Sequence, residues 1–120
     1  MGLDPCATDP DHYAVVSENE QVRVLEYRDQ PGVRTHPHEH PDSVMYALST
    51  FRRRLHAPGG GSRDVAVEAG STMWLPAQQH AGENIGDTDT HVVFVELKGA
   101  ARQPGAPLGP EAPGSTARRS

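Results

Sequence analysis

The chain has 120 residues, which is a usual length for one domain. Its net charge is −5 and its only basic run is the short stretch 52–54, so we expect no nucleic-acid partner. No apolar run is long enough to cross a bilayer and the first residues do not resemble a secretory signal, so we expect no membrane partner and a cytoplasmic location. The single cysteine, Cys6, excludes an internal disulfide and agrees with a reducing compartment.

Composition divides the chain into three parts. Residues 1–20 form an N-terminal segment, and residues 21–98 carry the alternating apolar pattern of a folded domain. Residues 99–120 are rich in Pro, Gly and Ala with one large aliphatic residue, Leu108, so we predict a disordered tail. A domain of this size has a modest core and exposed strand edges, which favours a homodimer.

Within the central part, short apolar runs with a period of two residues alternate with turn residues, which is typical of a β-sandwich or β-barrel. The turn residues lie at DQPG (29–32), PGGGS (58–62) and AGENIGDTD (81–89). No segment has helical periodicity over three turns. We therefore predict an all-β fold with strands at 22–27, 33–40, 44–51, 53–56, 65–68, 72–75 and 91–97.

Three of the seven histidines lie within five residues, in THPHEHPDSV (35–44). In a strand, side chains at i and i+2 share a face about 7 Å apart, so two neighbouring imidazoles can bind one ion. His36 and His40 would lie about 13 Å apart, too far to share a metal unless the strand bends. The trio therefore offers His38 with one of its two neighbours. The alternative is a solvated strand end that happens to contain histidines.

A mononuclear site needs a further ligand from another segment. His80, in WLPAQQHAGEN, follows a strand among polar residues and is the natural candidate. His12, His56 and His91 stand alone, as ordinary surface or hydrogen-bonded histidines do. An all-imidazole site favours one divalent transition metal ion, zinc, iron, copper or nickel. A metal binds the neutral ring, so we expect affinity to fall below about pH 6.

Two stretches resemble the motifs of small single-domain cupins. GVRTHPHEH (32–40) has the glycine, five residues and His-x-His of the first motif. GSTMWLPAQQHAGEN (70–84) has the glycine, proline, histidine and asparagine of the second, with one residue fewer before the histidine. The resemblance extends over about residues 20–97. It implies a jelly-roll β-barrel that binds a metal ion.

The resemblance implies four candidate ligands: His38, His40, His80 and, as a possible fourth, His36. The family's glutamate ligand is expected near the positions of Val44 and Met45, neither of which suits a hard divalent ion. Further stretches, among them FRRRL and FVELK, resemble a cupin subgroup that includes a beta-alanine degradation protein, which implies amino-acid catabolism.

Three other residues are candidates for catalysis. Tyr46 can donate a proton if it points inward with its strand, and Glu83 can act as a general base near the second motif. Arg53, if buried, needs a carboxylate, for which Glu96 is the expected partner, and it hints at a carboxylate-bearing substrate. We also expect that two polar side chains orient the ligating rings: Asp42 and Asn84.

The leading functional interpretation is a metal-dependent enzyme that acts on a small molecule. Its chemistry would be that of a dioxygenase, isomerase, lyase or cyclase. The alternatives are a non-enzymatic module that binds a small ligand or a metal, and a structural dimer whose histidines are solvated. Metal content separates the last of these from the other two.

Overall fold

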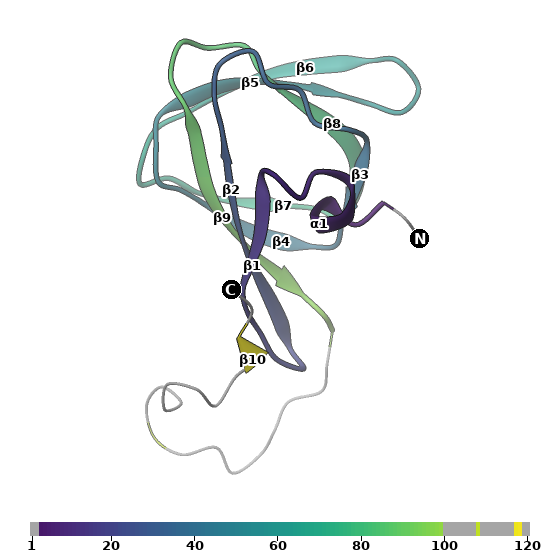
Figure 1. The fold of residues 1–120 in the computed structure, drawn as a ribbon, viewed down its shortest axis with the longest axis vertical. Coiled ribbons are helices and arrows are strands. Elements are labelled where there is room, and N and C mark those ends of the chain that lie inside the picture. Colours follow the sequence, from purple (N-terminus) through teal and green to yellow (C-terminus); the bar gives the residue numbers. More distant parts are fainter. Residues whose placement is uncertain (1–2, 100–107, 109–116, 119–120) are drawn as a thin grey trace.

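The computed structural model describes residues 3–99, Leu108 and residues 117–118. These residues form one short helix and ten strands (Figure 1), which confirms the all-β prediction. No helix in this part of the chain is long and apolar enough to cross a membrane. The elements are α1 (Pro5–Thr8), β1 (Tyr13–Glu18), β2 (Val22–Asp29), β3 (His38–His40), β4 (Ser43–Ala47), β5 (Phe51–His56), β6 (Ser62–Val67), β7 (Thr72–Leu75), β8 (Gln78–Asn84), β9 (Thr90–Leu97) and β10 (Ala117–Arg118).

The strands form two sheets. The larger has the order β10-β1-β2-β9-β4-β7, and the smaller has the order β3-β8-β5-β6. β2 and β9 pair along their whole lengths, from Val22 opposite Leu97 to Asp29 opposite Thr90. The smaller sheet begins with β3 and β8, which carry the two histidine motifs. This antiparallel arrangement agrees with the expected jelly roll.

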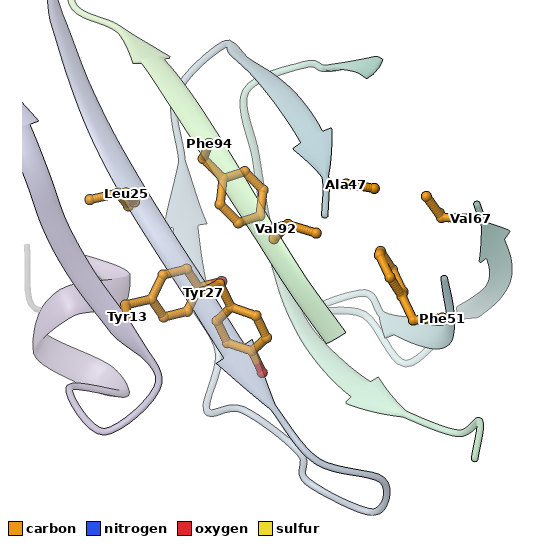
Figure 2. Packing of buried hydrophobic residues seen from close by; sticks show 8 residues of the cluster. All are labelled: Tyr13, Leu25, Tyr27, Ala47, Phe51, Val67, Val92 and Phe94. Atoms are coloured by element: carbon orange, nitrogen blue, oxygen red, sulfur yellow. The ribbon is translucent and has the colours of Figure 1, made fainter. Parts of the chain in front are cut away.

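The apolar core lies between the two sheets (Figure 2). Leu25 on β2 and Val92 on β9 are almost completely buried, while Phe51 and Val67 extend inward from the smaller sheet. The remaining members are Tyr13, Tyr27, Ala47 and Phe94. Two core residues contact the histidines. The ring centroid of Tyr13 lies 5.6 Å from that of His38, and the ring centroid of Phe94 lies 5.0 Å from that of His40.

The strands near the histidines differ from those predicted. β3 has three residues where eight were expected, because Pro37 and Pro41 donate no backbone hydrogen bond and limit the pairing. β8 begins before the stretch 81–89, which was predicted to be a turn, and continues into it as far as Asn84. Residues 81–84 pair with β5, and this pairing overrides their weak strand propensity.

The N-terminal segment contributes α1 and β1, neither of which was expected. β1 pairs with β2 from Tyr13 opposite Tyr27 onward, with a bulge between Val15 and Ser17. The predicted disordered tail lies outside the described residues, except Gly99, Leu108 and β10, and the backbone of β10 pairs with β1. The boundaries proposed for the three parts of the chain stay a prediction.

The first glycine of each histidine motif has a left-handed backbone. Gly32 and Gly70 both have φ of 90°, a region that side chains other than glycine rarely adopt. Each residue ends a turn ahead of a strand that lines the site. Their place in the two motifs therefore has a conformational reason.

Candidate metal centre

Three histidines from two neighbouring strands converge. His38 on β3 lies opposite His80 on β8 in the antiparallel ladder, and His40 follows two residues later on the same face. The ring centroids are 4.8 Å apart for His38 and His40, 5.1 Å for His38 and His80, and 5.3 Å for His40 and His80. One nitrogen from each ring lies within 4.8 Å of the other two. All three side chains are buried.

Hydrogen bonds on Nδ1 leave the Nε2 atoms of two rings without a hydrogen. His38 Nδ1 lies 2.8 Å from the backbone oxygen of His36, and His80 Nδ1 lies 2.6 Å from the Oε1 atom of Gln78. Both oxygens only accept, so each Nδ1 carries the hydrogen and donates it. Nε2 is then the unprotonated nitrogen that a metal binds.

His40 is buried with no hydrogen bond on either ring nitrogen within the part of the chain that the structure describes. Its Nδ1 lies 3.5 Å from the Oε2 atom of Glu96. A buried polar atom without a partner is costly, and such an atom in a group of metal-binding side chains fits a bound ion.

The electrostatics of the site favour neutral rings. Burial, followed by repulsion from His40, lowers the pKa of His38 to about 4. Burial and the neighbouring rings of His40 and His38 lower the pKa of His80 to about 3. Both rings are therefore neutral at pH 7, the form that binds a metal. The donor set fits one divalent ion of zinc, iron, copper or nickel.

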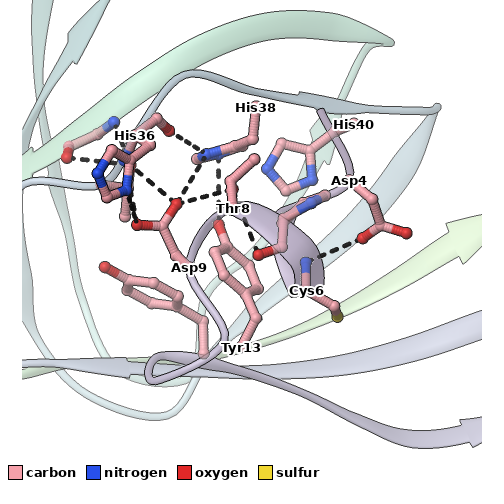
Figure 3. A network of polar contacts seen from close by, with 12 residues as sticks. Asp4, Cys6, Thr8, Asp9, Tyr13, His36, His38 and His40 are labelled. Atoms are coloured by element: carbon pink, nitrogen blue, oxygen red, sulfur yellow. Dashed lines mark hydrogen bonds and ion pairs between the residues drawn. The ribbon is translucent and has the colours of Figure 1, made fainter. Parts of the chain in front are cut away.

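His36 is not part of this cluster and contacts Asp9 instead (Figure 3). Its side chain is 76% exposed, and its Nδ1 lies 2.9 Å from the Oδ1 atom of Asp9. Asp9 is buried and also accepts a hydrogen bond from the backbone N–H of His36. Of the two pairs left open by the strand geometry, the structure brings together His38 and His40.

The three rings line a cavity of about 290 Å³. Its wall is largely apolar, with Phe51 and Val67 from the smaller sheet and Val92 and Phe94 from β9. The polar side chains on the wall, besides the histidines, are Tyr13, Tyr27, Arg53, Arg63, Gln78 and Thr90. The cavity can hold a small organic molecule next to the histidine nitrogens.

Arg53 lines this cavity, but its partner differs from the one expected. Its Nη1 atom donates to the Oδ2 atom of Asp29 at 2.6 Å and to the Oγ1 atom of Thr90 at 3.1 Å. The guanidinium also lies over the ring of Tyr27, at 5.1 Å. Glu96, the expected partner, lies on the same β9 strand as Thr90 but at its other end, bound to Arg23.

The other catalytic candidates point away from the rings. Tyr46 is 41% exposed on the outer face of β4, because Met45 and Ala47 occupy the inward positions, so the expectation that it points inward is wrong. Glu83 is on the opposite face of β8 from His80 and lies 3.0 Å from His56 Nε2.

The two residues expected to orient the rings form hydrogen bonds with other groups. Asp42 accepts a hydrogen bond from the backbone of Ala77. Asn84 donates to Asp29 and to the backbone oxygen of Thr88. That expectation is corrected: among the described residues, the hydrogen-bond partners of the rings are the His36 carbonyl, Gln78 and Tyr13.

Tyr13 was missed by the sequence reasoning. Its hydroxyl oxygen lies 3.4 Å from His38 Nε2, the nitrogen left free for a metal. Burial raises the pKa of Tyr13 well above its usual range, so the hydroxyl keeps its proton and can donate it in a hydrogen bond. The aromatic and β-branched residues in YAVVSE (13–18) were the available signal for this strand, but without alternation they do not indicate which way the tyrosine points.

A search of solved structures finds cupin domains with a similar fold. A cupin domain from Bordetella pertussis Tohama I is 32% identical, with 72% of this chain and 91% of that chain covered and a TM-score of 0.66. The chain therefore belongs to the cupin family. The sequence matches no protein-family model and no curated protein.

Two further structures are similar. A conserved protein with a double-stranded β-helix domain from Klebsiella pneumoniae is 25% identical, with 75% of this chain and 78% of that chain covered and a TM-score of 0.58. The polyketide cyclase RemF from Streptomyces resistomycificus is 21% identical, with 67% of this chain and 56% of that chain covered and a TM-score of 0.51. The likeness to the cyclase is one of fold.

Proposed function

We propose that this cupin is a metal-dependent enzyme that acts on a small organic molecule at an ion held by His38, His40 and His80. The observation that carries the proposal is the convergence of three buried, neutral rings on the wall of a cavity. A divalent ion held by these rings would supply a Lewis acid, and iron would also supply a redox-active centre. Dioxygenase, isomerase, lyase and cyclase chemistry are all compatible with it.

The residues of the chain shape the environment of the reaction. Tyr13 is placed to donate a hydrogen bond to a group bound beside His38 Nε2. The apolar wall around Phe51 and Phe94 excludes water and strengthens that hydrogen bond. A donor aimed at developing negative charge is a common source of rate enhancement.

The proposed substrate is a small organic anion, such as a carboxylate. Three neutral imidazoles leave the charge of a divalent ion uncompensated, and the nearby charge of Arg53 is already balanced by Asp29. A ligand with an anionic oxygen would balance the charge of the ion, and a mainly apolar remainder of the same molecule would fit the apolar wall of the cavity. A role in the catabolism of an amino acid such as beta-alanine is also proposed, and only the sequence resemblance supports it.

A non-enzymatic binding module is the second candidate. It is favoured by the missing carboxylate ligand: Val44 points outward, 38% exposed, and Met45 lines the cavity. Such a module would bind the metal and a small ligand without turnover.

Turnover distinguishes the two candidates. Metal-reconstituted protein is tested against small carboxylic acids and thiols for oxygen uptake and for product by mass spectrometry. The enzyme proposal predicts turnover that His38→Ala abolishes and Tyr13→Phe lowers about 100-fold or more. Ligand binding without product in the metal-loaded protein would favour the module.

A homodimer and a cytoplasmic location also stay proposals. Support for the dimer comes from an apolar outer face of the larger sheet, where Val44 lies opposite Trp74 and Tyr46 opposite Val93. Trp74 is 55% exposed there. Light scattering in solution measures the mass, and a monomeric mass at micromolar concentration would contradict the dimer.

A further inference from the structure

Glu96 is a buried carboxylate that the proposed chemistry does not use. It is 3% exposed on β9, with its side chain directed inward. Its Oε1 atom accepts a hydrogen bond from Arg23 Nε at 2.8 Å. Its Oε2 atom makes no hydrogen bond to any described residue. A buried carboxylate oxygen without a donor is costly, so its presence calls for a partner.

The nearest candidate partner is His40. Its Nδ1 atom lies 3.5 Å from Glu96 Oε2, slightly beyond a normal hydrogen bond, and neither atom has another partner in the described residues. The His40 ring is stacked on Phe94, with an interplanar angle of 28°. Phe94 and Glu96 are two residues apart on β9, so one strand both supports the ring and presents the carboxylate to it.

Glu96 is itself held in place from the N-terminal segment. Arg23 binds Glu96 through Nε and Asp4 through Nη1 and Nη2, at 2.8 and 3.1 Å. The Asp4 side chain also accepts a hydrogen bond from the backbone of Cys6 at the start of α1. The ion pairs therefore connect α1 to the carboxylate behind His40. They occupy Oε1 and leave Oε2 for the ring.

His40 stands between two cavities. It lines the cavity shared with His38 and His80, and it also lines a second one of about 400 Å³ together with Asp4, Arg23 and Glu96. If Nδ1 is directed to the carboxylate, Nε2 is the nitrogen that remains for the cluster. This is the same tautomer that the hydrogen bonds of His38 and His80 select.

We infer that Glu96 is a positioning residue of the metal centre, whose Oε2 accepts the Nδ1–H of His40 and so directs Nε2 to the ion. The inference rests on the proposed three-histidine metal site. A carboxylate behind a ligating histidine fixes its tautomer and raises its basicity, and the loss of such a partner typically weakens metal binding 10- to 100-fold. Glu96 contributes no atom to the ligand cluster itself.

Zinc affinity of the full chain, measured by competition with a chromophoric chelator, tests this role. Glu96→Gln keeps the size of the side chain but removes its charge, and we expect zinc binding to weaken about 10- to 100-fold. Glu39→Gln is the matched control, because Glu39 is adjacent to His40 but exposed. We expect its affinity to stay within about threefold, since solvent and salt screen an exposed charge.

The outcomes are distinguishable. Wild-type protein that binds no zinc overturns the metal site and this inference with it. If Glu96→Gln binds zinc as tightly as the wild type does, the inference alone is overturned. An equal loss of affinity in Glu96→Gln and Glu39→Gln also overturns it, because that result would indicate a general effect of charge. Thermal unfolding of the metal-free proteins identifies a variant that has not folded.

A measurement on the wild type decides the matter if Glu96→Gln does not fold. Nitrogen-15 NMR of the histidine rings in zinc-loaded protein distinguishes the bound nitrogen from the protonated one. We expect zinc on Nε2 of His40 and a slowly exchanging proton on Nδ1. Zinc on Nδ1, or rapid exchange of that proton, would overturn the inference.

Discussion

The Nδ1 atom of each ring in the cluster faces a different kind of oxygen. His38 meets a backbone carbonyl, His80 the amide of Gln78, and His40 the carboxylate of Glu96. Spacing on the sequence indicated which histidines share a strand face, but these partners come from β8, β9 and a bend before β3. The His36 carbonyl and Gln78 each lie two residues from the ring that they contact. Glu96 lies on a distant strand, and its contact with His40 could not be predicted, because it depends on the register of the sheets.

At the residue scale, the lowered pKa values predict acid sensitivity of the metal-free protein. An unfolded histidine titrates near pH 6.5, whereas His38 titrates at about 4 and His80 at about 3. Between pH 6.5 and 4 the unfolded chain therefore binds more protons, so the free energy of unfolding falls as the pH falls. The slope is up to about 1.4 kcal/mol per pH unit for each ring. Above pH 6.5 this contribution does not change.

Urea unfolding of metal-free protein at several pH values between 7 and 4 measures the slope. His38→Gln removes one titrating ring, so its stability should depend less steeply on pH than that of the wild type. Equal slopes would contradict the lowered pKa of His38. In the folded site, proton competition for that ring begins below about pH 4, lower than the pH 6 expected from an ordinary histidine.

At the scale of the elements, the packing of β5 against β8 explains why Gly82, which was predicted to lie in a turn, is a glycine. A Cβ atom on Gly82 would lie 2.7 Å from the Nη2 atom of Arg53, so the glycine lets the guanidinium pack against the strand. In the sequence, AGEN reads as turn residues. Close approach of a side chain from another strand gives glycine the same signature as a turn, and local pattern does not distinguish them.

The two faces of β5 allow a controlled test of this packing. Arg53→Met leaves Asp29 buried without its cation, and we expect the free energy of unfolding to fall by about 3–5 kcal/mol. Arg54→Met, on the same strand, removes an arginine that is 42% exposed and paired with Asp64, so its effect should be much smaller. Denaturant unfolding of both variants measures the difference. Equal losses would contradict a structural role for the Arg53–Asp29 pair.

At the scale of the whole molecule, the metal centre depends on segments from both ends of the fold. β3 and β8 supply the ligands, the N-terminal segment supplies Tyr13 and Asp9, and β9 supplies Glu96. The all-β class and the three clustered histidines could be predicted, because alternation and motif spacing are local properties of the sequence. The part played by the first twenty residues could not, since YAVVSE does not alternate and the direction of Tyr13 has meaning only beside β2 and the rings.

The most direct test of the three-histidine site is metal content. We would measure it by mass spectrometry on protein purified without a histidine tag, for the wild type, His38→Ala, His80→Ala and the control His12→Ala, which removes a histidine bound to the Arg28 carbonyl. The site predicts one equivalent of zinc, iron, copper or nickel in the wild type and the control, and its loss in the other two variants. Wild-type protein that stays metal-free after reconstitution, or metal retained in both His38→Ala and His80→Ala, would contradict it.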